Sequence, residues 1–575
     1  MKKLLIANRG EIAVRIIRAC RDYGITAVAV YSDPDADALF VSLADEAYAL
    51  GGSQASETYL DISKLIEAAK RAGADAVHPG YGFLSERAEF AEAVISAGLT
   101  WIGPAPSVIE TLGDKVKARQ IAASVGAPLA AGSDGPVSSS AEVIAFAKAH
   151  GLPVAIKAAF GGGGRGLKVA WKIDEIEELY HSAVREAEAA FGRGECFVER
   201  FLERPRHVEA QVMADQHGNV IVVGTRDCSM QRRNQKLIEE APAPFLTAAQ
   251  RDEIEASAKA ICKAAGYTGA GTVEFLLGKD GTLSFLEVNT RLQVEHPVTE
   301  ETSGIDLVIE QLRVADGQPL SFIEAPEPRG HSIEFRINAE DPGRGFLPMP
   351  GTITRFNAPS GPGVRLDSGV MRGSAVSGFY DSLVAKLVVT GKTREDAIRR
   401  ARRALAEFEI DGLSTVLPFH RTALEAPDFT AENGFKIYTR WIEDDFASTL
   451  EPARRPEAPV GENLIRTHIE IDGKRHQVGI PATLLSHFSA PSSPIVANVK
   501  SDDNLNDGMV VAPVSGTLQS YKAEDGDHVE EGDLIAIIEA MKMETQVRAI
   551  RSGKLLRQAV EGAYIEAGAS LGRID

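Results

Sequence analysis

Residues 272–295 read TVEFLLGKDGTLSFLEVNTRLQVE, in which two apolar runs flank an Asp-Gly pair. The runs predict a β-hairpin with strands over 272–277 and 282–288, because Asp-Gly is typical of a two-residue turn. Counting back from that turn places Glu274 directly opposite Glu287. Facing carboxylates destabilise a sheet, and a divalent cation between them reverses that sign. The hairpin therefore predicts a Mg²⁺ site.

The polar residues that follow the hairpin extend this pattern. Period-two alternation carries four further side chains toward the face of Glu274, namely Asn289, Arg291, Gln293 and Glu295. A metal ligand, a cation, an amide and a carboxylate in one row are typical of residues that line an active site. A solvated strand face is the competing interpretation, and it does not require the facing glutamates.

A glycine-rich loop upstream is a second candidate for binding phosphate. Residues 156–169 read IKAAFGGGGRGLKV, which predicts strand, loop and strand. A Walker loop would instead read G-x-x-x-x-G-K-[ST] and open a helix. Consecutive glycines can present backbone N–H groups to phosphate oxygens and can also close as a lid. A flexible surface loop explains the glycines alone equally well.

Residues 1–112 alternate short apolar strands with amphipathic helices, which predicts a parallel sheet covered by helices. The expected strands are Leu4–Ala7, Ala27–Tyr31, Ala76–His78 and Thr100–Ile102, and the expected helices are Glu11–Tyr23, Ile62–Ala72 and Ala88–Ala97. The first strand–helix turn contains only Gly10 rather than G-x-G-x-x-G, so dinucleotide binding is not supported.

The middle of the chain changes character twice. Residues 113–330 mix helices and strands, and residues 331–447 add strands and a basic helix, Arg394–Phe408. Residues 448–508 are rich in proline and serine, which is typical of a linker. Within that linker, Asp472-Gly473 between Thr467–Ile471 and Lys474–Val478 predicts a short hairpin.

Residues 509–575 repeat one pattern twice. Ser515-Gly516, Gly526 and Gly532 in the first half correspond to Ser552-Gly553, Gly562 and Gly568 in the second half. Two copies of one strand–turn pattern predict a small, quasi-symmetric β-sandwich. Lys542 lies between the copies, in Glu-Ala-Met-Lys-Met-Glu, and is expected at a hairpin tip. An ordinary surface lysine is the competing interpretation.

Bulk properties exclude several classes of function. The 575 residues are 44% hydrophobic and 25% charged, as in globular proteins with full cores. A formal net charge of −19 argues against broad binding to nucleic acid or membrane surfaces. The four cysteines lack metal-ligand spacing and are expected to be buried thiols. Together with the lack of a long apolar stretch, this composition predicts a soluble, cytoplasmic protein.

Specific motifs resemble two known families. Ala540-Met541-Lys542-Met543 matches the biotin carrier motif, and residues 509–575 resemble a biotinyl carrier domain. Residues 1–447 resemble biotin carboxylases with their ATP-grasp core. The motifs that carry this second resemblance are HPGYGFLSE at 78–86, RDCSMQRR at 226–233 and EVNTRLQVEHPVTE at 287–300.

The resemblance implies a multidomain α/β and α+β fold. Its expected parts are a Rossmann-like domain at 1–112, an ATP-grasp domain at 113–330 with a lid at about 131–203, a carboxylase C-terminal domain at 331–447, a linker at 448–508 and an all-β carrier domain at 509–575. It also implies biotin on Lys542, ATP, and Mg²⁺ or Mn²⁺ held by Glu274, Glu287 and Asn289.

The resemblance further implies site residues. The catalytic set is Lys236, Arg291, Glu295 as the base for bicarbonate, and Arg336 as the partner of the ureido oxygen of biotin. The remaining residues expected to contact ATP, bicarbonate or biotin are Lys115, Lys157, Gly162, Gly163, Gly164, Glu199, Leu202, His207, Gln231, Gln293, Val294 and Asp381. Asn234 stands where many members have histidine and is left out, because it cannot carry charge.

A carboxylase and carrier fused at this length resemble the α subunit of an acyl-CoA carboxylase, particularly the actinobacterial type. This implies carboxylation through carboxyphosphate, a separate carboxyltransferase β subunit acting on acetyl- or propionyl-CoA, fatty acid biosynthesis, a biotin protein ligase and a hetero-oligomer. The alternatives are another ATP-grasp ligase with a lipoyl-like carrier, and a non-catalytic scaffold. Residues 464–481 are expected to help dock the partner, although packing on their own neighbours is equally compatible.

Overall fold

The N-terminal part is a parallel sheet covered by helices, as the sequence predicts. The computed structural model describes residues 1–575 except 134, 159–166, 192–193, 433, 447–449, 454–463, 472–473, 482–507 and 542. The first sheet has the order β3-β2-β1-β4-β5, with strands β1 (Lys3–Ile6), β2 (Thr26–Tyr31), β3 (Glu46–Ala49), β4 (Ala76–His78) and β5 (Thr100–Trp101). Its helices are α1 (Gly10–Tyr23), α2 (Leu39–Leu43), α3 (Ile62–Ala72), α4 (Ala88–Ser96) and α5 (Pro106–Gly113).

The predicted elements of this part agree with the structure to within one residue at each end, and strand β3 and helices α2 and α5 were missed. Strand β3 is a short edge strand in which each residue is at least partly exposed. Its sequence Glu-Ala-Tyr-Ala has too few apolar residues for a periodicity argument to find it.

An eight-stranded sheet forms the centre of the molecule, with the order β13-β12-β9-β10-β11-β14-β21-β19. Its strands are β9 (Arg206–Ala214), β10 (Val220–Arg232), β11 (Gln235–Ala241), β12 (Gly269–Leu277), β13 (Leu283–Asn289), β14 (His331–Asn338), β19 (Val364–Ser368) and β21 (Leu383–Gly391). The sheet therefore joins residues from the expected ATP-grasp and C-terminal parts. Neighbouring helices are α6 (Lys115–Ser124), α9 (Ala248–Ala264), α10 (His296–Ser303), α11 (Leu307–Ala315) and α12 (Arg394–Glu407).

Short elements complete the C-terminal part of the carboxylase. The strands are β15 (Glu340–Asp341), β16 (Leu347–Pro348), β17 (Gly351–Thr352), β18 (Arg355–Asn357), β20 (Ala375–Val376) and β22 (Glu409–Asp411), and the helices are α13 (Leu417–Ala423), α14 (Pro427–Thr430) and α15 (Trp441–Asp444). Helix α12 lies against β14 and β21, and its buried residues follow helical spacing. This packing fixes the strand pair that carries Arg336.

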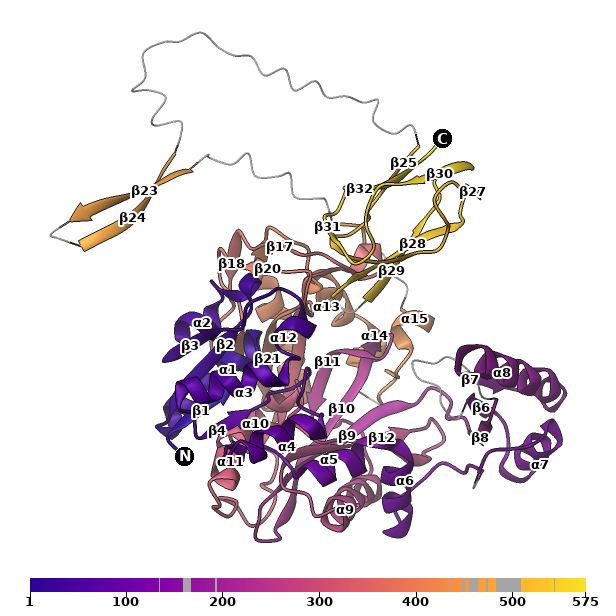
Figure 1. Cartoon of the computed structure of the whole chain (residues 1–575). Helices are drawn as coiled ribbons and strands as arrows, with labels where there is room; N and C mark the ends of the chain where they lie inside the picture. The colour runs from indigo at the N-terminus through magenta and orange to yellow at the C-terminus, as the bar shows by residue number, and fades with distance from the viewer. Residues whose placement is uncertain are drawn as a thin grey trace.

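A three-stranded sheet with two helices stands out from the side of the molecule (Figure 1). Its elements are α7 (Ser140–His150), β6 (Val154–Ala158), β7 (Leu167–Ala170), α8 (Ile176–Phe191) and β8 (Cys196–Arg200). Strands β6 and β7 pair antiparallel, so the predicted strand–loop–strand arrangement is confirmed. Gly162, Gly163 and Gly164 lie outside the described residues.

The C-terminal repeat folds as a sandwich of two four-stranded sheets, β25-β32-β30-β27 and β29-β28-β26-β31. The strands are β25 (Met509–Val511), β26 (Gly516–Tyr521), β27 (His528–Val529), β28 (Leu534–Ala540), β29 (Met543–Arg548), β30 (Gly553–Arg557), β31 (Tyr564–Ile565) and β32 (Ser570–Ile574). The predicted internal symmetry is visible in the backbone, because Gly526 and Gly562 both have φ between 80° and 90°. Residues other than glycine rarely adopt that backbone conformation.

The hairpin around the candidate modification site is confirmed. Ala540 pairs with Met543, so two residues connect β28 to β29. Met541 has a φ of 50°, the left-handed conformation that tight hairpin turns require. Lys542 itself lies outside the described residues.

The linker hairpin is also present, as β23 (Leu464–Ile471) and β24 (Lys474–Pro481), drawn apart from the rest of the chain in Figure 1. Among the described residues, every helix is too short or too polar to cross a lipid bilayer.

Candidate active site

The β12–β13 hairpin brings Glu274 and Glu287 directly opposite each other, as predicted. The predicted turn was wrong, however. The Gly278 N–H donates to the Thr282 carbonyl at 2.8 Å, so three residues form the connection. Phe275 pairs with Phe285, which makes Leu286 the extra residue of a bulge. The bulge offsets the longer turn, and the facing glutamates keep their register.

The residues after β13 reach the site by a different route from the one predicted. Strand β13 ends at Asn289, and residues 290–295 form a loop before α10. Period-two alternation therefore does not apply to them. The loop nevertheless brings the polar groups together: Arg291 Nη2 donates to Asn289 Oδ1 at 3.1 Å, and Gln293 Nε2 donates to Glu274 Oε1 at 2.9 Å. A buried Leu292 side chain anchors the loop beneath them.

Lys236 lies at the centre of the site. Its Nζ donates to three carboxylates: Glu209 at 2.7 Å, Glu274 at 3.0 Å and Glu295 at 2.6 Å. Burial alone would lower the pKa of Lys236, but Cys228, Glu209 and the other carboxylates raise it well above its ordinary value. The ammonium is therefore a permanent cation to which a bound anion can be attracted.

Glu274 accepts hydrogen bonds from several sides. Oε1 accepts from Lys236, from Asn289 Nδ2 at 2.9 Å and from Gln293, and Oε2 lies 2.9 Å from His207 Nε2. Burial would raise the pKa of Glu274, yet Lys236 and His207 hold it well below its ordinary range. The same ion pair raises the pKa of His207, against the effect of burial.

Glu295 and Arg336 form the other half of the cluster. Arg336 Nη2 donates to Glu295 Oε2 at 2.9 Å, and Arg336 Nε donates to Glu239 Oε1 at 2.5 Å. Burial opposes ionisation of Glu295, but Lys236 and Arg336 lower its pKa. Glu295 is thus an ionised carboxylate held between two cations.

The structure places the residues expected to hold nucleotide along the edge of this cluster and toward the protruding sheet. Lys115 Nζ lies 3.2 Å from Glu287 Oε2, and the Lys115 side chain is 79% exposed. Lys157 on β6 pairs with Glu199 on β8. Leu202 is buried just beyond β8. The ammonium groups of Lys115 and Lys157 are accessible to a polyphosphate.

Two further predicted residues, Gln231 and Val294, contact the cluster or its surroundings. Gln231 Nε2 lies 3.3 Å from His207 Nδ1. The carbonyl of Val294 accepts from Lys386 Nζ at 2.9 Å, and Lys386 also pairs with Glu11 of helix α1 at 3.1 Å. Lys386 is fully buried, so this pair ties the N-terminal part to the catalytic loop.

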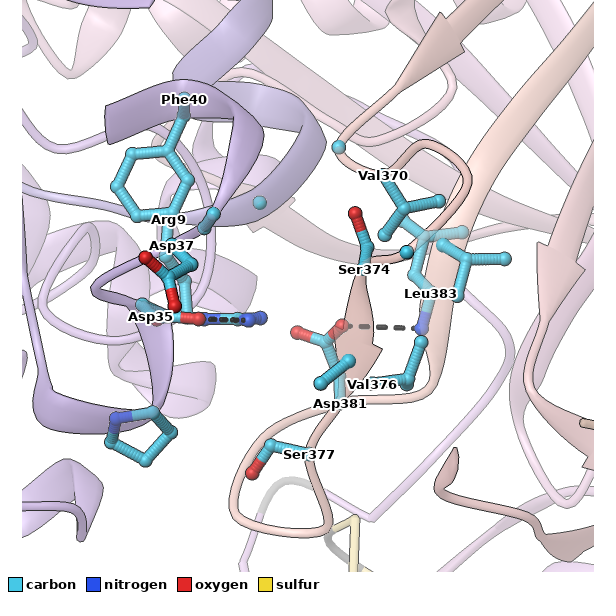
Figure 2. A pocket seen from close by; sticks show the side chains of 17 residues that line it. Arg9, Asp35, Asp37, Phe40, Val370, Ser374, Val376, Ser377, Asp381 and Leu383 are labelled. Atoms are coloured by element: carbon cyan, nitrogen blue, oxygen red, sulfur yellow. Dashed lines mark hydrogen bonds and ion pairs between the residues drawn. The ribbon is translucent and has the colours of Figure 1, made fainter. Parts of the chain in front are cut away.

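Asp381 occupies a separate place. It lines a cavity of about 170 Å³ between the N-terminal part and the loops before β21, opposite Arg9 and Asp35 (Figure 2). Its carboxylate accepts from the Leu383 N–H at 3.2 Å. The predicted proximity of Asp381 to a biotin pocket remains a prediction.

Sequence reasoning missed several residues of the cluster. Glu209 alternates with apolar neighbours on β9, and a buried carboxylate at that spacing was the available signal. Arg226 is fully buried and donates to Glu209 Oε1 at 2.5 Å and to Gln211 Oε1 at 2.7 Å. Glu86 accepts from Arg291 Nε at 2.8 Å. These partners come from distant segments, which no local pattern connects.

The cysteines are free and buried, as predicted. One of them nevertheless belongs to the site, because Cys228 Sγ lies 3.8 Å from Glu295 Oε1. Asn234 is exposed in the two-residue β10–β11 turn, where Arg233 and Asn234 have φ of 48° and 65°. Asparagine tolerates that conformation well, which explains the residue in backbone terms.

The candidate metal ligands fit a hard divalent cation. Glu274, Glu287 and Asn289 offer only oxygen ligands, which suits Mg²⁺ or Mn²⁺. Two other close groups among the described residues, His207–Glu209–Glu274 and Glu209–Cys228–Glu295, lie around the Lys236 ammonium. A cation at the facing glutamates would replace the charges that Lys115 and Lys236 supply to them here.

Family models match four successive parts of the chain. They are "Biotin carboxylase, N-terminal domain" at residues 1–109, "Carbamoyl-phosphate synthase L chain, ATP binding domain" at 114–323, "Biotin carboxylase C-terminal domain" at 334–444 and "Biotin-requiring enzyme" at 508–574. A "Biotin-dependent acyl-coenzyme A carboxylase alpha3 subunit" of Mycobacterium leprae is 56% identical and is aligned over 100% of this chain and 98% of its own length.

The chain belongs to the biotin carboxylase family. It joins biotin carboxylase domains to a biotin carrier domain, and its activity is the ATP-dependent carboxylation of biotin. The biotin carboxylase of Haemophilus influenzae is 51% identical over 75% of this chain and 96% of its own length.

Solved structures agree with this assignment. A biotin carboxylase complex from Campylobacter jejuni has a TM-score of 0.70 and 45% identity, covering 77% of this chain and 98% of its own. The biotin carboxylase domain of the Hydrogenobacter thermophilus 2-oxoglutarate carboxylase, in complex with MgADP, ADP and bicarbonate, has a TM-score of 0.70 and 43% identity, covering 78% of this chain and 99% of its own.

A pair of facing glutamates behind Arg336 is a further feature of this biotin carboxylase. Glu239 on β11 is directly opposite Glu334 on β14, and both are fully buried. Burial and the nearby Glu295 charge raise the pKa of Glu239 to about 7, although Arg336 opposes this. Burial raises the pKa of Glu334 well above its ordinary value. Neither oxygen of Glu334 has a hydrogen-bond partner within the described part of the chain.

The Glu209→Gln variant is expected to lower bicarbonate-dependent ATP cleavage roughly tenfold to a hundredfold, because Lys236 and Arg226 lose a shared charged partner. Steady-state ATPase assays on the biotinylated chain measure the effect. Glu253→Gln, at an exposed position of α9, is the matched control and should keep full activity. Wild-type rates in Glu209→Gln would contradict a role for this carboxylate in holding the cluster.

The Glu239–Glu334 pair predicts a pH dependence of stability. Between a carboxyl's ordinary pKa and about 7, the folded state binds more protons than the unfolded state. Protonation of the pair therefore stabilises the folded state fully at low pH, and this stabilisation is lost as the pH rises toward 8. Glu334→Gln should raise the free energy of unfolding at pH 8 by about 1–3 kcal/mol and flatten the pH dependence.

Thermal unfolding between pH 5 and pH 8 tests this prediction. The control is Glu300→Gln, because Glu300 is buried but paired with Arg15 and Arg365, which lower its pKa against burial. That variant should be destabilised by about the same amount at pH 5 and at pH 8, because the lowered pKa of Glu300 keeps the wild-type carboxylate ionised throughout this range. A lower unfolding temperature of Glu334→Gln at pH 8 would contradict the inference about the facing pair.

Proposed function

We propose that this chain is the α subunit of an acyl-CoA carboxylase that carboxylates biotin on its own Lys542. A separate carboxyltransferase β subunit would then transfer the carboxyl group to an acyl-CoA of the acetyl- or propionyl-CoA class. The similarity to the Mycobacterium leprae subunit extends along the whole chain and includes the carrier. That full-length match supports the α-subunit assignment over a free-standing biotin carboxylase.

The observation that carries the chemical proposal is the cluster in which Lys236 meets three buried carboxylates and Arg336 meets two. Burying so many ionised groups is unfavourable unless they are paired. The arrangement provides cations for an anionic substrate beside an ionised carboxylate. A non-catalytic scaffold would not require this arrangement.

Bicarbonate and the γ-phosphate of ATP repel each other, so cations must neutralise both before they react. We assign this role to Lys236 and Arg291. One bicarbonate oxygen would form a bond to the γ-phosphorus as the bond to ADP breaks, giving carboxyphosphate. Glu295 would accept the bicarbonate proton.

The structure suggests how Glu295 becomes a base. In the chain alone, Lys236 and Arg336 hold its pKa low. An anion bound between these cations would accept their hydrogen bonds and weaken their effect on Glu295. The pKa of Glu295 would then rise toward that of a useful proton acceptor. Substrate binding itself would thus activate the base.

Biotin would supply the ureido nitrogen that accepts CO₂ from carboxyphosphate, and Mg²⁺ would neutralise phosphate charge. Arg336 would donate to the ureido oxygen. Glu274, Glu287 and Asn289 would hold the cation, a set whose all-oxygen chemistry fits Mg²⁺. Phosphate leaving carboxyphosphate would take the ureido proton, so no further base is needed.

The nucleotide would lie between the cluster and the protruding sheet. Lys115 and Lys157 would contact phosphates, and the segment of Glu199 and Leu202 would hold adenine. His207, Gln231, Gln293 and Val294 would line the nucleotide or bicarbonate site. We propose that residues 131–203, including Gly162, Gly163 and Gly164, act as the lid of an ATP-grasp domain at 113–330. The other proposed parts are the Rossmann-like domain at 1–112, the carboxylase C-terminal domain at 331–447, the linker at 448–508 and the carrier domain at 509–575.

Four assignments follow from the acyl-CoA carboxylase proposal. They are a cytoplasmic hetero-oligomer, a role in fatty acid biosynthesis, attachment of biotin by a biotin protein ligase, and docking of the β subunit by residues 464–481. The linker hairpin supports the last of these, because two strands alone are marginally stable and gain from a partner.

Labelled bicarbonate gives the direct test of the proposed activity. The biotinylated chain with ATP and Mg²⁺ is expected to place label on the peptide containing residue 542. Label should be absent without ATP and absent in Lys542→Arg. Arg336→Gln should lower the labelling rate roughly 10²- to 10³-fold, as expected for a donor to developing charge. Label that persists in Lys542→Arg would contradict carboxylation on this lysine.

Deleting residues 464–481 tests the docking assignment. The truncated chain is expected to label itself normally, because the hairpin lies apart from the carboxylase (Figure 1), and to lose assembly with the β subunit in size-exclusion chromatography. Undiminished assembly would show that the hairpin does not dock the partner.

A further inference from the structure

The carrier domain contacts the carboxylase at residues 377–381, in the loop between β20 and β21. The Tyr564 ring of the carrier stacks on the Phe379 ring with centroids 4.6 Å apart and an interplanar angle of 28°. The Met541 N–H donates to the Gly378 carbonyl at 3.3 Å. Aromatic and backbone contacts therefore meet at the same short loop.

The carrier turn is partly buried by the carboxylase. Met541, at the tip of the β28–β29 hairpin, is only 5% exposed and packs with the core of the carboxylase C-terminal part. Leu347 of β16 in turn packs against the core of the carrier sandwich. Each domain thus packs one apolar side chain against the core of the other, so the interface is partly hydrophobic rather than purely polar.

Gly378 is required by this close approach. A Cβ at that position would lie 2.8 Å from Tyr564 Oη and 3.3 Å from the Ser515 carbonyl oxygen. The backbone of Gly378 does not need a left-handed φ, so its lack of a side chain serves the carrier contact rather than a turn. A side chain at this position would therefore require the Tyr564 hydroxyl and the Ser515 carbonyl to shift.

The opposite side of the loop contacts the N-terminal part of the carboxylase. The Tyr380 hydroxyl donates to Ser32 Oγ at 2.7 Å, and the Arg9 guanidinium lies 4.3 Å from the centre of the Tyr380 ring. Asp381 faces the cavity opposite Arg9 (Figure 2). The loop is therefore held on its inner side while the carrier rests on its outer side.

The loop also leads toward the catalytic cluster. Leu383, just after it, pairs with Asn338, and Lys386 pairs with Arg336. At about 3.3 Å per residue, roughly 10 Å of strand separates Leu383 from the level of Arg336. The loop that the carrier contacts therefore lies about three strand residues from the level of Arg336.

We propose that Tyr564 and Met541 dock the carrier on the 377–381 loop, and that this is the position from which the chain presents its own biotin for carboxylation. This inference rests on the proposed self-carboxylation and adds its recognition surface. The alternative is a storage position, in which the same contact keeps the carrier away from the catalytic cluster. The short path along β21 to Arg336 favours the productive position.

Single-turnover labelling with bicarbonate in the full-length biotinylated chain tests the proposal. Tyr564→Ala is expected to slow labelling of the residue 542 peptide roughly three- to tenfold, the loss that removal of an aromatic pair implies. Tyr564→Phe keeps the stacked ring and should stay within about twofold of wild type. Val560→Ala, at an exposed position before the same strand, is the matched control and should label normally.

An assay with free biotin distinguishes an effect on carrier docking from an effect on the carboxylation reaction. ATP cleavage stimulated by free biotin should be unchanged in Tyr564→Ala, because free biotin does not use the carrier. Gly378→Ala approaches the same contact from the carboxylase side and should slow only the labelling of the tethered biotin. Circular dichroism and biotin content of each variant confirm an intact carrier.

Labelling of Tyr564→Ala at the wild-type rate would overturn the proposal, because the contact would then not assist carboxylation. Faster labelling would also overturn it, because the variant would then have released a storage contact. An equal loss with tethered and free biotin would also overturn it, because the effect would not be one of docking. A wild-type chain that labels neither biotin would instead refute the proposed function, so the two failures are distinguishable.

Discussion

The buried Lys236 ammonium is the constraint on which the rest of the site depends. Three carboxylates from β9, β12 and the loop before α10 converge on one nitrogen. Each of these groups would be costly to bury alone, and together they are stable only in one geometry. The central sheet supplies that geometry, because β9, β11 and β12 lie close together within it. Removing any one carboxylate changes the charge balance around Lys236 as well as removing one contact.

Secondary partners extend this constraint outward. Arg226 holds Glu209 from behind, Glu86 holds Arg291, and Glu239 holds Arg336. Lys386 connects the carbonyl of Val294 to Glu11 of the N-terminal part. The cations are therefore fixed before a substrate arrives, which is the condition for electrostatic stabilisation at low reorganisation cost. The three parts of the carboxylase act as one support for this reason.

The carrier domain obeys a different requirement. Its own core is small, and within the described part of the chain its contact with the carboxylase centres on Gly378, Phe379 and Leu347. A carrier that serves two catalytic sites must leave each of them, so a contact of modest size suits it better than an extensive one. The loop that it touches is firmly held on its inner side by Tyr380.

The sequence by itself determined most local elements and the internal repeat of the carrier, and it named most of the candidate residues that the structure gathers around Lys236. Those features depend on periodicity, turn chemistry and motifs, all of which are local. It also placed Glu274 opposite Glu287, although through a turn that is one residue too short and a bulge at Leu286 that compensates. Only the tertiary structure decided that Glu209, Arg226, Cys228 and Glu86 belong to the site and that Asp381 lies in a separate cavity. These residues come from segments far apart in the chain, and burial energies of paired charges depend on that packing rather than on any sequence spacing.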